Sequence, residues 1–155
     1  MHAKTKGSIA ELQVCADLTR RGWKILIPYG ENQRYDLVAE KEGKFVRIQV
    51  KYVTPRNGVL IVNCRSSNNW STQSYSADQI DFIATYNPEN GGVYYVPVSE
   101  IRRQTMILRV APSKNNQKAK VRYAKAYAGL PFVRDSSPVP SSSCFDAMPL
   151  VHCGS

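Results

Sequence analysis

Two β-like segments separated by a short turn are the feature that most restricts how this chain can fold. Residues 34–39 and 45–53 flank the sequence Lys41-Glu42-Gly43-Lys44. Glycine adopts positive φ without strain, so this turn is typical of a tight β-hairpin. If Glu42 and Gly43 are the two loop residues, each residue pairs with the one whose number brings the sum to 85.

This register has a chemical consequence. It sets Leu37 opposite Ile48 on one apolar face, because side chains alternate along a strand with period two. It also sets Asp36 opposite Gln49, and Lys51 projects from the same face as Gln49. A bulge would shift the pairing by one residue. The hairpin therefore predicts a carboxylate, an amide and an ammonium group at one place.

A helix is predicted before the hairpin. Thr5 or Ser8 can cap it, it runs to about Arg21, and Gly22 stops it. The residues expected on its apolar face are Ile9, Leu12, Ala16 and Cys15.

Further elements follow from apolar runs and turn residues. Strands are predicted at residues 23–27, 59–64, 82–86 and 93–96. Residues 66–76 form a polar surface loop, Ser99 caps a short helix through Arg103, and residues 118–127 are a candidate helix ending at Gly129. The pattern predicts an α/β fold with a mixed β-sheet flanked by helices.

The charge of the chain favours an acidic partner. Lys and Arg number 21 against 12 Asp and Glu, a formal net charge of +9 at pH 7. Residues 102–134 contain nine basic side chains and no Asp or Glu. Such a surface is typical of nucleic-acid binding, and a solvated basic face is the alternative.

The length indicates one domain, expected over residues 1–135, with a Ser- and Pro-rich C-terminal tail at 136–155. Four scattered cysteines give neither zinc-site spacing nor a disulfide framework. No signal peptide or membrane span is predicted. These features favour a cytoplasmic protein.

Asp36, Gln49 and Lys51 suit phosphodiester hydrolysis. A carboxylate and a neutral carbonyl oxygen bind a hard cation such as Mg²⁺, the cation activates water, and lysine adds positive charge. Without a metal, Asp36 beside Lys51 is a structural salt bridge.

The same residues carry a family resemblance. Tyr35-Asp36 followed by Gln49-Val50-Lys51, with an upstream helix bearing Glu11, resembles the PD-(D/E)XK nuclease superfamily and its restriction-endonuclease-like core. Gly22-Trp23, Pro28-Tyr29-Gly30 and residues 94–99 extend the likeness to the group I intron homing endonucleases of that superfamily. It covers about two-thirds of the chain, to about Arg103.

The resemblance implies roles for these residues. It assigns metal coordination to Asp36 and the backbone carbonyl of Val50, with Glu11 contributing directly or through water. Lys51 would orient the attacking water or help to deprotonate it. Gln49 stands where most of the superfamily has Asp or Glu, so a ligand charge is lost. One firmly held Mg²⁺ is expected, for which Mn²⁺ can substitute.

Recognition of DNA is assigned to aromatic and basic residues. Trp70 and Tyr75 in the polar loop are candidates for base or sugar contacts, with a plain surface loop as the alternative. The candidates for phosphate contacts are Arg102, Arg103, Lys118, Lys120 and Arg122.

Three functions are compatible with these features. The favoured one is a sequence-specific homing endonuclease that makes a double-strand break in a long DNA target, acting as a homodimer or, as the resemblance implies, a homotetramer. A Holliday junction resolvase would share the core but recognise branch shape. A non-catalytic basic DNA-binding protein would use Asp36 and Lys51 only as a structural pair.

Overall fold

A computed structural model describes residues 1–30, 33–68, 71–112 and 121–132 of the chain. In chain order its elements are α1 (Ala3–Arg20), β1 (Lys24–Leu26), β2 (Leu37–Lys41), β3 (Lys44–Tyr52), β4 (Val59–Asn63), β5 (Arg65–Asn68), β6 (Ser71–Ser74), β7 (Phe82–Tyr86), β8 (Val93–Pro97), the 3-10 turn η1 (Val98–Glu100), β9 (Thr105–Arg109) and the 3-10 turn η2 (Ala124–Tyr127).

The central element is a five-stranded sheet in the order β1-β2-β3-β7-β8. Strands β3 and β7 are parallel and the other neighbours are antiparallel, which confirms the predicted mixed sheet. The hairpin register is also confirmed, since Leu37 pairs with Ile48 and Lys41 with Lys44. Glu42 and Gly43 have φ values of 51° and 78°, as expected for the two central residues of a type I′ turn.

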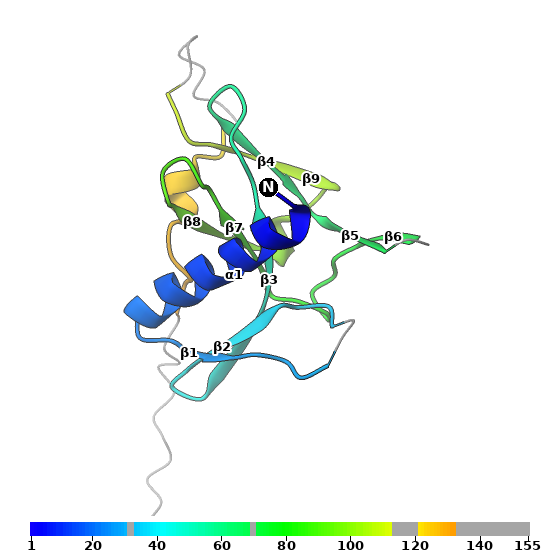
Figure 1. Cartoon of the computed structure of the whole chain (residues 1–155), viewed down its shortest axis with the longest axis vertical. Helices are drawn as coiled ribbons and strands as arrows, with labels where there is room; N and C mark the ends of the chain where they lie inside the picture. Colours follow the sequence, from blue (N-terminus) through cyan, green and yellow to red (C-terminus); the bar gives the residue numbers. More distant parts are fainter. Residues whose placement is uncertain (31–32, 69–70, 113–120, 133–155) are drawn as a thin grey trace, which may run out of the picture.

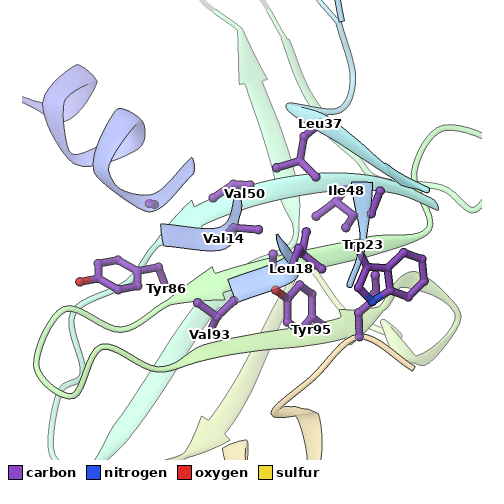
Figure 2. Close-up of a cluster of buried hydrophobic side chains, with 13 residues drawn as sticks. Val14, Leu18, Trp23, Leu37, Ile48, Val50, Tyr86, Val93 and Tyr95 are labelled. Atoms are coloured by element: carbon purple, nitrogen blue, oxygen red, sulfur yellow. The ribbon is translucent and has the colours of Figure 1, made fainter. Parts of the chain in front are cut away.

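Helix α1 covers one face of this sheet and crosses in front of it in Figure 1. Its buried side chains meet apolar residues of β2, β3, β7 and β8, and Figure 2 shows Val14 and Leu18 among them. The buried members of this first core are Ala10, Val14, Leu18, Trp23, Leu37, Ala39, Ile48, Val50, Ala84, Tyr86, Val93, Tyr95 and Leu130.

The predicted apolar face of the helix is wrong in part. Leu12 is 69% exposed and Ala16 is also exposed, whereas Ala10, Val14 and Leu18 are fully buried. These three residues repeat every fourth position, so they form one stripe against the sheet. The helix also begins at Ala3, earlier than either predicted cap. Its end at Arg20, followed by Gly22 at φ 79°, agrees with the predicted stop.

The opposite face of the sheet is covered by an antiparallel ribbon of β4 and β9 rather than by a helix. The inner residues of this ribbon alternate with the exposed side chains Ile61 and Ile107. The second core consists of Leu60, Val62, Cys64, Tyr75, Ile80, Ile83, Tyr94, Val96, Val98, Met106, Leu108 and Ala124. Strand β9 was not predicted, because its run of apolar residues lacks the alternation that marks a half-buried strand.

Three local predictions are wrong. The polar segment 66–76 contains the paired strands β5 and β6, which project away from the rest of the molecule in Figure 1. Residues 99–103 contribute only to η1, and the described part of 118–127 contains only η2. No hydrophobic period marks a strand in the polar segment, so the local sequence pattern did not indicate this hairpin.

Among the described residues, no helix combines the length and the apolar character needed to cross a membrane. The proposed division into residues 1–135 and a tail remains a prediction, since residues 133–155 lie outside the described part.

Truncation of one core side chain tests this assignment of the helix. Leu18→Ala removes a fully buried side chain from the first core. We expect it to lower the free energy of unfolding by about 2–5 kcal/mol, measured by denaturant titration. Leu12→Ala, the same change at a 69% exposed position of the same helix, should alter it by less than about 0.5 kcal/mol. Equal losses in the two variants would contradict the helix orientation.

Candidate active site

Asp36 lies immediately before β2, where this strand separates from β3. Its N–H donates at 2.9 Å to the carbonyl of Ile48, the residue already paired with Leu37, so the regular register of the hairpin ends at Asp36. Its side-chain Oδ2 accepts two hydrogen bonds of 2.6 Å, one from Gln49 Nε2 and one from the Val50 N–H. The carboxylate thus replaces a backbone carbonyl as the acceptor at the end of the ladder. Asp36 and Gln49 lie next to each other, as predicted.

Lys51 is two residues beyond Gln49, so both side chains leave β3 on the face opposite to α1. The Lys51 ammonium donates to the Tyr75 hydroxyl at 3.2 Å, and its Nζ lies 5.3 Å from the centre of the Tyr75 ring. Burial raises the pKa of Asp36, and the positive charge of Lys51 offsets part of this rise. The structure therefore brings the carboxylate, the amide and the ammonium group to one place.

The carboxyl groups of this region resist ionisation. Burial raises the pKa of Asp36 above its ordinary value of 3.8, and this effect outweighs the hydrogen bonds from Val50 and Gln49 and the charge of Lys51. The pKa of Glu11 is also raised, first by burial and then by the negative charge of Asp36. Glu11 on α1 and Asp36 before β2 are therefore close enough to repel each other.

The oxygen atoms here suit a hard divalent cation. Asp36 and Glu11 contribute carboxylates whose mutual repulsion a cation would relieve. Gln49 turns its amide nitrogen toward Asp36, so rotation of the amide would present its oxygen to such a cation. The carbonyl of Val50 lies on the same edge of β3 as the N–H bound to Asp36, because both groups of a strand residue point to one side. No cluster of three or more His, Cys, Asp and Glu exists within the described ranges, so a cation here would also depend on neutral ligands.

The residues predicted to bind DNA have different placements. Tyr75 is 8% exposed in the second core, so it contacts Lys51 instead of presenting its ring to solvent. Arg103 and Arg122 line a cavity of about 380 Å³ along β9, and Arg102 lies in a neighbouring cavity with both. Residues Trp70, Lys118 and Lys120 lie outside the described part of the chain.

The contact between Tyr75 and Lys51 is the site feature that sequence reasoning missed. The two residues are 24 positions apart, and Tyr75 follows a polar stretch whose local pattern predicted a surface loop. Only the packing of the second core brings its ring beneath Lys51.

The raised pKa of Asp36 predicts a pH-dependent cost to stability. Below its ordinary value of 3.8, folded and unfolded protein both hold the proton. As the pH rises through the raised pKa, the unfolded chain releases the proton more readily, so the folded state loses stability. We therefore expect metal-free wild type to become less stable relative to Asp36→Asn as the pH rises from about 3.8 to 7.

Unfolding free energies of both proteins across this pH range measure the difference. Glu11 faces the same carboxyl and contributes in the same direction, so Glu11→Gln is compared in parallel. A gain of stability by wild type relative to Asp36→Asn as the pH rises would contradict the burial of this carboxyl.

Proteins of known family and known structure resemble this chain. The sequence matches the PD-(D/E)XK endonuclease family over residues 1–130. No match is found among curated protein sequences. The structure resembles that of a bacterial homing endonuclease, I-Ssp6803I, with a TM-score of 0.66 and 25% identity, covering 82% of this chain and 88% of that one.

A second solved structure is similar only at a lower level. The Holliday junction resolvase Hjc of Archaeoglobus fulgidus, an archaeal hyperthermophile, gives a TM-score of 0.42 and 16% identity, covering 67% of this chain and 84% of that one. The family match, in contrast, extends over α1, the hairpin, both layers of the core and η2. The chain therefore belongs to the PD-(D/E)XK endonuclease family.

Proposed function

We propose that the protein is a Mg²⁺-dependent homing endonuclease that hydrolyses DNA at a long, specific target. The observation that carries this is the buried Asp36 carboxyl at the end of the hairpin, with Gln49 bound to it and Lys51 beside it. Family membership supports a DNA-hydrolysing enzyme with a divalent metal. The likeness to I-Ssp6803I over most of both chains supports the homing activity.

In this proposal Asp36, Glu11, the amide oxygen of Gln49 and the Val50 carbonyl hold the cation. When bound, the cation would lower the pKa of a water and stabilise the negative charge that develops on the phosphate. Water attacks phosphorus, one phosphorus–oxygen ester bond breaks, and the leaving oxygen takes a proton. Lys51 orients the attacking water and adds positive charge beside the reacting phosphate.

The chain supplies one such site, so breaking both strands needs at least two copies. We propose a homodimer or, by analogy with the group I intron enzymes that the sequence resembles, a homotetramer. The basic surface around Arg103 and Arg122 would contact phosphates outside the active site. A Holliday junction resolvase would instead prefer branched DNA, which the following assay distinguishes.

Cleavage of a randomised linear duplex library and of four-way junctions, measured in parallel, tests the function. We expect wild type to cut both strands of a subset of sequences with Mg²⁺ or Mn²⁺ and none with a chelator. Asp36→Asn should abolish cleavage while it still binds DNA, because the fold and the basic surfaces remain. Preferential cutting of four-way junctions would favour the resolvase. Metal-independent DNA binding without any cleavage would contradict the assignment as an enzyme.

The contact of Lys51 with Tyr75 predicts a second effect. Tyr75→Phe retains the ring and removes the hydroxyl that accepts from Lys51. Because a misplaced catalytic group costs rate, we expect single-turnover cleavage to slow by about ten- to a hundredfold with unchanged DNA affinity. Tyr94→Phe is the matched control, since Tyr94 is 8% exposed in the same core and its hydroxyl accepts from Asn90 instead.

A double-mutant cycle separates positioning from a general packing defect. If Tyr75 acts through Lys51, then Tyr75→Phe causes no further loss of rate in a Lys51→Ala background. Independent, multiplicative losses would show that the hydroxyl does not act through the lysine.

A further inference from the structure

A groove of about 430 Å³ opens next to the candidate active site. Its lining residues are Lys6, Lys51, Tyr52, Val53, Thr54, Arg56, Ile61 and Asn63. Three of them are cationic, and within the described residues its lining includes no Asp or Glu. Lys51 belongs both to this groove and to the surroundings of Asp36, so the two sites are continuous.

Lys6 reaches the groove from the N-terminal part of α1. Its ammonium lies 5.7 Å from the centre of the Tyr52 ring on the neighbouring β3. This cation–π contact directs the flexible side chain toward the groove but supplies no anionic partner.

Arg56 reaches the groove from the tight turn between β3 and β4. Two backbone hydrogen bonds between Arg56 and Val59, of 2.8 and 3.0 Å, close this turn. Asn57 and Gly58 both have positive φ, and a Cβ on Gly58 would lie 3.0 Å from the Cβ of Ala111. The arginine is thus exposed on a fixed backbone.

Some cations of the chain are neutralised by salt bridges, and within the described residues Lys6 and Arg56 are not among them. Lys24 pairs with Glu40, Arg47 with Asp81 and Arg21 with Asp17. A groove with three cations and no carboxylate suits an anion. Since it is continuous with Asp36, the anion that reaches both is a nucleic-acid backbone.

We propose that Lys6 and Arg56 bind a phosphate of the DNA strand next to the phosphate that is cleaved. Arginine's planar guanidinium suits two phosphate oxygens, and the lysine adds a point charge. The strand then passes from Asp36 across Lys51 into the groove, which positions the reacting phosphate. This inference rests on the proposed nuclease function.

Salt-dependent DNA binding tests the proposal. Affinity of the full chain for duplex DNA is measured by fluorescence anisotropy in chelator, for wild type, Lys6→Gln and Arg56→Gln. Each lost phosphate contact should reduce the slope of log affinity against log salt by about 0.9. Between about 50 and 200 mM salt, the total loss of affinity should therefore be about 3.5-fold smaller for each variant than for wild type.

Arg20→Gln is the matched control, because it removes the same charge from the opposite end of α1, where the side chain is 70% exposed. The slope of this variant should equal that of wild type. If all three variants change the slope equally, only the net charge matters and the proposed site is overturned.

Neutral phosphate analogues locate the contact. A cleavable duplex from the library receives one methylphosphonate at a time on each strand. Wild type should lose affinity when the phosphate adjacent to the cleaved one is neutral, and Lys6→Gln and Arg56→Gln should lose less at that position alone. No change at this position would refute the proposal although the protein still cleaves DNA. Absence of any cleavable duplex would refute the proposed function, and the salt slopes would still test the groove.

Discussion

The hydrogen bond from the Val50 N–H to the Asp36 carboxylate is the interaction on which the site depends. It forms at the point where β2 leaves β3, so a side chain replaces the backbone carbonyl that would otherwise continue the ladder. The hairpin register, set by its two-residue turn, decides which residue stands there. A shift by one residue would turn Asp36 toward the apolar face, because alternate side chains point to opposite sides of the sheet.

At the site, this fixed backbone holds two carboxyl groups, Asp36 and Glu11, whose ionisation is disfavoured. Burial raises the pKa of Asp36, and the nearby negative charge contributes to the raised pKa of Glu11. Two such carboxylates cost stability in the free protein, and a bound cation would relieve this cost. Perturbed pKa values of this kind are typical of functional sites. Lys51 is held against the buried Tyr75 and contributes positive charge near Asp36.

Each layer of the fold supports a different part of this site. Helix α1 packs on one face of the sheet and brings Glu11 near Asp36 and Lys6 near Tyr52. The ribbon of β4 and β9 packs on the other face and completes the core around Tyr75, and its strand β4 lines the groove beside Lys51. Strands β7 and β8 contribute side chains to both cores, and β3, which carries Gln49, Val50 and Lys51, lies beside β7.

The hairpin and the proximity of Asp36, Gln49 and Lys51 can be predicted from the amino-acid sequence, because a two-residue turn and strand alternation are local properties. The sequence also predicts the mixed α/β fold. In contrast, packing between distant segments sets which face of α1 is buried, that residues 66–76 contain a hairpin, and that β9 covers the sheet. The same is true of the contact between Tyr75 and Lys51 and of the groove with Lys6 and Arg56, because these depend on packing between residues distant in the chain, which no local pattern encodes.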